Sequence, residues 1–76
     1  MQFAYEIVEF GTGRILGGGL SAPGKFGTAE EFMTRERAEL QDLQLQGQMQ
    51  PGLTWTLREI SVEAYKADWM PPEHQH

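Results

Sequence analysis

The chain has 76 residues, with eleven acidic side chains against six basic ones and a net charge of −5. A single domain of this size buries only about 60–65% of the surface of its unfolded chain, and without cysteine it has neither a disulfide nor a thiolate metal site to reinforce it. Its negative field opposes the counterion release that drives most nucleic-acid binding, and it favours basic partners, which include proteins that themselves hold nucleic acid.

Residues 2–10, QFAYEIVEF, predict the first strand, because aromatic and β-branched side chains suit a pleated sheet. Large apolar side chains fall on both faces of this strand. The Gly-Thr-Gly sequence at residues 11–13 tolerates positive φ angles and predicts a hairpin loop. Residues 14–16 predict the returning strand, which either ends there or extends as far as Leu20.

Residues 17–27 contain five glycines and a proline, which predict a loop. Within this loop, GLSAPGK at residues 19–25 matches the spacing of a nucleotide phosphate-binding loop, G-x-x-x-x-G-K. Phe26 stands where that pattern needs a magnesium-binding hydroxyl, and Pro23 has no amide hydrogen to offer a phosphate. We therefore expect a link from the hairpin to a helix, with Phe26 packed beneath it, and no nucleotide site.

Thr28 and Glu31 form a capping box, which predicts a helix from residue 29 to about residue 45 or 46. Gly47 is placed to adopt the left-handed conformation just beyond the helix end. The apolar side chains of this segment fall in one arc of about 100° when successive residues are about 100° apart, as on a helix that packs against a sheet.

Glu36 lies near the centre of that apolar arc, where a charge is costly unless it is paired. We expect it to meet a basic or hydroxyl partner, with Arg14, Arg58 and Tyr5 as the candidates, or to project past the edge of the sheet.

Residues 53–65, LTWTLREISVEAY, predict the last and longest strand. The apolar side chains alternate on odd positions up to Leu57 and on even positions from Ile60, so we expect either a one-residue bulge at residues 58–59 or two short strands. Residues 66–76 include two prolines and predict an irregular C-terminal tail.

The order strand, strand, helix, strand predicts an α+β fold, with residues 1–76 as a single domain. A right-handed crossover gives a three-stranded antiparallel sheet (ββαβ, order 2-1-3) with one helix packed on one face. The other face would keep exposed apolar side chains, which usually mark a contact surface. We therefore expect a homodimer or a protein partner.

No set of residues predicts an enzyme, a metal site or a cofactor. The two histidines, His74 and His76, lie in the predicted tail, whereas a structural metal site usually needs four fixed ligands. Ser21 and Ser61 have no histidine outside that tail to act as a base. We expect no catalytic residues and no cofactor.

In size, acidity and strand–helix order the chain resembles the small phage-encoded anti-CRISPR inhibitors of bacterial immunity. The resemblance rests on these general features of the whole chain. It implies a non-enzymatic protein-binding module in the cytoplasm of a bacterial host, acting as an acidic inhibitor of a nucleic-acid-handling complex such as a CRISPR–Cas effector. Acidic residues on the exposed helix face and an exposed aromatic residue are the predicted partner-binding residues: Glu30, Glu31, Glu39, Asp42 and Trp69.

Two alternatives remain open at this point. Phe3, Tyr5 and Trp55 offer a stacking platform for nucleic acid on the face of the sheet, although the net charge opposes direct binding. An accessory subunit or an antitoxin of a bacterial complex would show the same general features. A membrane partner is not expected, because no apolar run approaches the roughly 20 residues of a membrane span.

Overall fold

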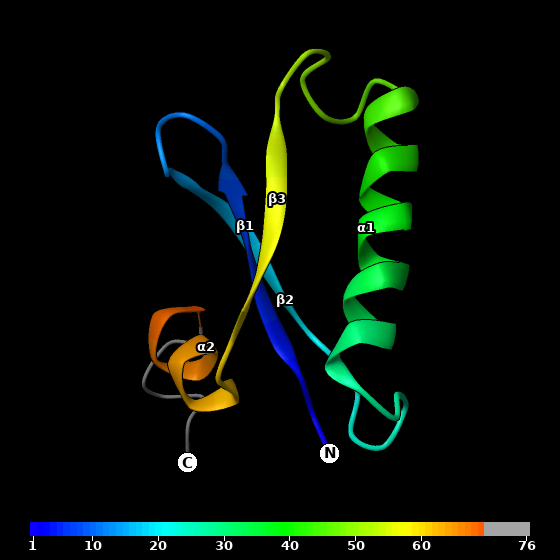
Figure 1. The fold of residues 1–76 in the computed structure, drawn as a ribbon, viewed down its shortest axis with the longest axis vertical. Helices are drawn as coiled ribbons and strands as arrows, with labels where there is room; N and C mark the ends of the chain where they lie inside the picture. The colour runs from blue at the N-terminus through cyan, green and yellow to red at the C-terminus, as the bar shows by residue number, and fades with distance from the viewer. Residues whose placement is uncertain (70–76) are drawn as a thin grey trace.

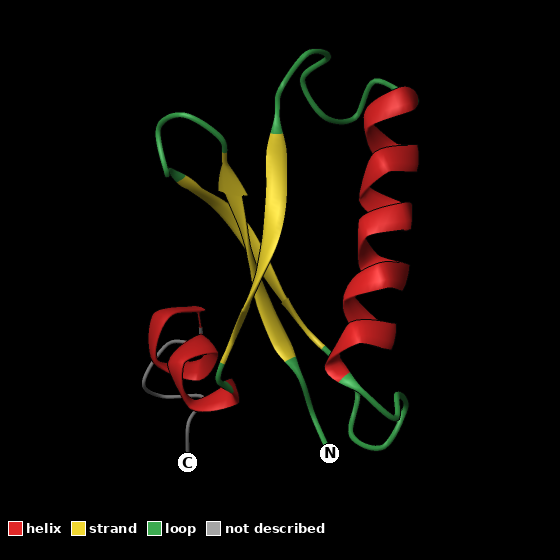
Figure 2. Ribbon diagram, viewed as in Figure 1, coloured by secondary structure: helices red, strands yellow, loops and turns green. Residues whose placement is uncertain are grey.

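The computed structural model describes residues 1–69. Its elements are, in chain order, β1 (Ala4–Glu9), β2 (Ile15–Leu20), α1 (Ala29–Leu45), β3 (Trp55–Ile60) and α2 (Val62–Trp69). The three strands form one antiparallel sheet in the order β2-β1-β3, with the long helix α1 alongside it (Figures 1 and 2). The predicted α+β fold and strand order are confirmed.

One face of the sheet and α1 enclose the hydrophobic core. Tyr5, Ile7, Phe32 and Leu57 are its buried residues. The Phe32 ring lies between two other aromatic rings, with centroid distances of 5.4 Å to Tyr5 and 5.2 Å to Phe26. Phe26 therefore packs beneath the corner before α1, as predicted.

The chain after Ile60 differs from the prediction. Neither a bulge at residues 58–59 nor a second strand forms, because the Ser61 hydroxyl accepts a hydrogen bond from the Ala64 amide at 3.1 Å and starts helix α2. A serine cap of this kind competes with extended backbone, and the apolar alternation alone does not reveal it. Residues 66–69, expected to be irregular, are the second half of α2, and the rest of the predicted tail, 70–76, lies outside the described residues.

The glycines at residues 17–19 belong to strand β2, so the longer of the two expected extents of the returning strand, to Leu20, is confirmed and the loop begins after it. A β-carbon on Gly19 would lie 2.6 Å from the ring of Tyr5, and one on Gly18 would lie 3.1 Å from the indole Nε1 of Trp69. Glycine is therefore required here because an aromatic ring lies directly against each face of the strand.

Helix α2 lies against the second face of the sheet, which the sequence led us to expect to be open. Beneath it Ala4 is fully buried, and Glu6 is 5% exposed and forms an ion pair with Arg58 of β3. At the hairpin end the cover stops, and Ile15 is 46% exposed. Helix α2 therefore covers part of the sheet face that was expected to be open.

The ends of α1 follow the predicted signals with one difference. The Thr28 hydroxyl accepts from the Glu31 amide at 3.1 Å, whereas the Glu31 carboxylate accepts from the Gly27 amide, one residue before the expected cap amide. Gly47, with a φ of 82°, follows the C-terminal cap residue Gln46.

Candidate interaction surfaces

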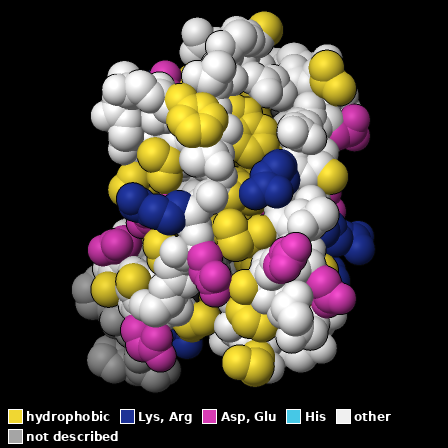
Figure 3. All heavy atoms as spheres, viewed as in Figure 1, with side chains coloured by type: hydrophobic (Ala, Val, Ile, Leu, Met, Phe, Trp, Pro, Cys, Tyr) yellow, Lys and Arg dark blue, Asp and Glu magenta, His cyan; other side chains and the backbone are white. Residues whose placement is uncertain are grey.

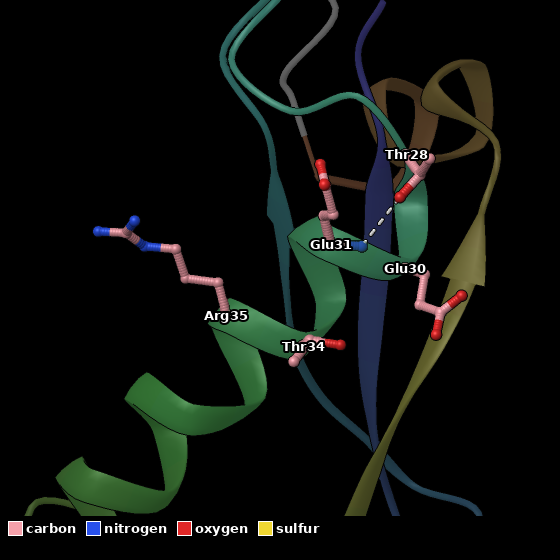
Figure 4. Close-up of a pocket in the computed structure, with 5 residues that line it drawn as sticks. All are labelled: Thr28, Glu30, Glu31, Thr34 and Arg35. Carbon is pink, nitrogen blue, oxygen red and sulfur yellow. Dashed lines mark hydrogen bonds between the residues drawn. The ribbon is translucent and has the colours of Figure 1, made fainter.

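The predicted acidic residues of α1 are all exposed, yet they do not form a single patch of one sign. At about 100° per residue, Glu31, Asp42 and Glu39 fall within an arc of about 80°, and Arg35 falls inside it. Glu30 projects from a different side of the helix. Figure 4 shows Glu30 and Arg35 pointing apart. The four predicted acidic residues therefore lie on two sides of α1, with Glu31, Glu39 and Asp42 around Arg35 and Glu30 on the neighbouring side; together we call these four the acidic face of α1.

Most of these carboxylates already have contacts within the chain. Glu39 forms an ion pair with Arg35 at 3.3 Å, and Asp42 accepts a hydrogen bond from Gln46 at 3.2 Å. Exposed pairs of this kind contribute only about 0–1 kcal/mol, so a partner can exchange them at little cost. A shallow groove at the start of the helix is lined by Thr28, Glu30, Glu31, Thr34 and Arg35 (Figure 4).

Trp69 was predicted to be an exposed contact residue, and it is 40% exposed. Its ring stacks on that of Tyr65 at 6.3 Å with an interplanar angle of 27°, and it covers Gly18 of β2. The residue therefore anchors α2 on the sheet and presents only part of its indole to a partner.

A second concave surface lies between the hairpin end, the start of β3 and the C-terminal half of α1, and we call it the aromatic groove. Its lining residues are Phe10, Arg37, Gln41, Gln44, Leu53, Thr54 and Trp55. Figure 3 shows hydrophobic side chains gathered on this side of the molecule, with basic side chains beside them. The sequence did not predict this surface. Arg37, Gln41 and Gln44 have helical spacing and lie beside the apolar arc, and this spacing is the feature of the sequence that could have indicated the groove.

Gln44 fixes the floor of the aromatic groove through three hydrogen bonds. Its amide nitrogen donates to the carbonyls of Gln50 at 2.9 Å and Leu53 at 3.0 Å, and its oxygen accepts from the indole Nε1 of Trp55 at 3.1 Å. One helix side chain thus holds both the connecting loop and the first residue of β3.

Glu36 meets one of its predicted partners, because the Tyr5 hydroxyl donates to its carboxylate at 3.1 Å. Burial raises the pKa of the Glu36 carboxyl above its ordinary value; the Tyr5 hydrogen bond opposes the shift and the nearby charge of Glu39 adds to it. Burial, followed by the Glu36 charge, also raises the pKa of the Tyr5 hydroxyl. The pair is a structural contact between β1 and α1.

Replacement of Glu36 by glutamine is expected to change how stability depends on pH. Because the folded-state pKa of Glu36 is raised, its contribution to stability is largest below the ordinary value of 4.5 and is lost as the pH rises through the folded-state pKa. The E36Q variant lacks this loss, so its stability relative to the natural chain should improve as the pH rises from 4.5 toward neutrality. Urea unfolding across that range measures the difference, with E30Q as the control for removal of one negative charge. A pH-independent difference for E36Q would contradict the assignment.

The loop that matches a phosphate-binding pattern is occupied by contacts within the chain. The amides of Gly24, Lys25 and Gly27 donate to acceptors of the protein at 3.0, 3.2 and 3.1 Å. The Lys25 ammonium lies 5.6 Å from the centre of the Phe26 ring. Amides already used in this way do not form the cradle that a phosphate needs.

The stacking platform considered for nucleic acid is reduced in this fold, because Tyr5 is buried and Phe3 and Trp55 are partly buried. Tyr5 is 4% exposed and its hydroxyl is bonded to Glu36, while Phe3 and Trp55 pack against the core. Base stacking requires an accessible ring face. The sheet face therefore gives no support to that alternative.

The described part of the chain, residues 1–69, shows neither a metal-ligand cluster nor a membrane-spanning helix. In that part of the chain no group of three histidine, cysteine, aspartate or glutamate side chains is placed to hold a metal ion. His74 and His76 lie outside the described residues. Neither helix is long and apolar enough to cross a bilayer.

No family model, curated protein or solved structure matches the chain. What its geometry defines is a small α+β protein whose three-stranded sheet carries a helix on each face. Two accessible features of residues 1–69 are the acidic face of α1 and the aromatic groove.

Proposed function

We propose that this chain is a non-enzymatic protein-binding module, and that it acts as a small acidic inhibitor of a bacterial nucleic-acid-handling complex. A CRISPR–Cas effector is a complex of this kind. The observation that carries the proposal is the placement of Glu30, Glu31, Glu39 and Asp42, all exposed on α1 of a chain whose net charge is −5. A partner with a basic surface fits this charge, and surfaces that hold nucleic acid are basic.

Burial of the sheet supports protein binding over direct nucleic-acid binding. Tyr5, the aromatic residue of β1, lies in the core, and four acidic residues lie exposed on α1, whereas a nucleic-acid binder presents a continuous set of lysine, arginine and stacking rings. An acidic surface instead competes with nucleic acid for a basic protein groove.

The proposal is tested by charge reversal on α1. We expect the variant E30K/E39K/D42K to lose capture of a nucleic-acid-handling complex from bacterial extract, because three attractions become repulsions. Glu31 is left unchanged because it caps the helix. Affinity capture followed by mass spectrometry identifies the retained proteins, and inhibition of the captured complex on its nucleic-acid substrate measures the activity.

A matched control changes the net charge by the same amount on other elements. The variant E59K/E63K/D68K reverses three exposed acids of β3 and α2 and should still capture and inhibit the complex. Equal behaviour of the two variants would overturn the role of α1. Retarded oligonucleotides at low salt with the natural chain would favour the nucleic-acid alternative instead.

Self-association stays a prediction. Ile15, 46% exposed, and Phe10, 61% exposed, are the apolar residues at the hairpin end that α2 leaves uncovered. A homodimer that uses them should be disrupted by I15K, and light scattering with size-exclusion chromatography distinguishes a mass near 8.6 kDa from twice that value.

A further inference from the structure

The aromatic groove differs from the rest of the surface in its charge. Among the described residues 1–69, Arg37 is the one charged residue that lines it, and no carboxylate does. The adjoining hollow, at the end of α1, is lined by uncharged residues only. By contrast, the hollows along the outer face of α1 contain Glu30, Glu31, Glu39 and Asp42. The groove is therefore a locally basic, apolar site on an acidic protein.

Arg37 also differs from the other arginines. Arg14, Arg35 and Arg58 each form an ion pair, with Glu9, Glu39 and Glu6 respectively. Within residues 1–69, Arg37 has no carboxylate within ion-pair distance. Its guanidinium presents a set of donors that fits a carboxylate in bidentate geometry.

The apolar part of the groove is held in a defined position. The Trp55 indole is fixed by its hydrogen bond to Gln44, and Phe10 beside it is 61% exposed. A large exposed aromatic next to a fixed indole forms a site for an apolar side chain.

The backbone of β3 adds a third feature. The strand order makes β3 an edge strand. The Phe10 amide donates to the Thr54 carbonyl at 3.0 Å, so in the antiparallel alternation the backbone groups of the next residue, Trp55, point to the outer side. No strand pairs with that side within residues 1–69. An extended peptide gains main-chain hydrogen bonds at such an edge.

We propose that the aromatic groove binds a short extended segment of another protein, in which an apolar side chain alternates with a carboxylate. The apolar side chain lies against Phe10 and Trp55, and the carboxylate pairs with Arg37. This site has the opposite charge from the acidic face of α1 and does not depend on the function proposed for that face.

The test uses the full chain, labelled with ¹⁵N, and two defined probes. N-acetyl-Glu-Leu-Glu-Leu-amide is expected to shift the indole signal of Trp55 and the amide signals of Thr54 and Phe10, and N-acetyl-Lys-Leu-Lys-Leu-amide to bind more weakly. The difference should be on the order of fivefold, as expected for one accessible ion pair, and should shrink as salt is added. The W69F variant identifies which of the two indole signals belongs to Trp55.

A charge swap separates the proposed contact from general attraction. The R37E variant should reverse the preference between the two peptides, whereas R35E, on the outer face of the same helix, changes the net charge equally and should keep it. Equal response to both peptides, an unchanged preference in R37E, or the absence of shifts in the groove at millimolar peptide would each overturn the proposal.

Discussion

Replacement of Gly19 by alanine is expected to destabilise the fold by about 1–3 kcal/mol, the usual cost of overpacking a well-filled core. The new β-carbon would lie 2.6 Å from the ring atoms of Tyr5. That ring is not able to move aside, because it packs against Phe32 and its hydroxyl is bonded to Glu36. The clash therefore disturbs both the core and the contact between β1 and α1. Urea unfolding of the purified variant measures the loss.

Gly17 provides the matched control in the same strand. A β-carbon there meets the Cδ1 atom of Ile7 at 3.5 Å, an ordinary van der Waals contact. Since alanine also reduces the entropy of the unfolded chain, G17A should be neutral or should stabilise the protein by up to about 1 kcal/mol. Equal losses of unfolding free energy for G17A and G19A would mean that glycine is needed for the strand backbone in general and not to leave space for the Tyr5 ring.

Replacement of Phe32 by alanine is expected to have the largest effect on stability. Phe32 is 2% exposed and lies between Tyr5 and Phe26, so its removal leaves a cavity at the centre of the core. Phe→Ala changes at such positions cost about 3–5 kcal/mol. A chain of 76 residues has a total stability of only roughly 4–11 kcal/mol, so the F32A variant should lose on the order of half of its stability and melt at a much lower temperature than the natural chain.

Circular dichroism during heating measures this effect, and F32L provides the comparison. Leucine fills most of the same volume, so F32L should retain a cooperative transition at a lower temperature. A melting temperature for F32A close to that of the natural chain would show that the core does not depend on this ring.

The sequence predicted the elements that have strong local signals. The capping box and the glycine after α1 placed the long helix within a residue of its observed ends, because side-chain caps act over a few residues. Glu36 was correctly expected to need a partner, and Tyr5 was among the three candidates. The helical pattern alone places the Glu36 carboxyl among apolar side chains, and a buried carboxyl needs a hydrogen-bond or ion-pair partner.

The sequence left one segment open and misassigned another, for different physical reasons. Residues 17–19 fitted both a loop and the end of the returning strand, because glycine tolerates any conformation, and the rings of Tyr5 and Trp69 explain their place in the strand. The segment after Ile60 alternates like a strand, but its hydrogen bonds begin a helix that covers the sheet. Contacts between distant segments decided the first case, and a local serine cap that the apolar alternation does not reveal decided the second.

The candidate interaction surfaces were predicted only in part, because one lies on a single helix and the other joins several elements. Exposure of the acidic residues on α1 follows from the helical period. The position of Arg35 among them follows from that period too, but the sequence interpretation considered only the acids. The aromatic groove joins Phe10, Trp55 and Arg37 from three elements, and no pattern within one segment places them together.

The most direct test of the proposed function is the affinity of the captured partner for three proteins: the natural chain, the E30K/E39K/D42K variant and the E59K/E63K/D68K control. Isothermal titration calorimetry at low and at physiological salt provides the comparison. We predict that reversal on α1 weakens binding at least about tenfold, equivalent to about 1.4 kcal/mol, while the control stays within about threefold of the natural chain. Equal affinities for the two variants would contradict the proposal that this protein binds its partner through the acidic face of α1.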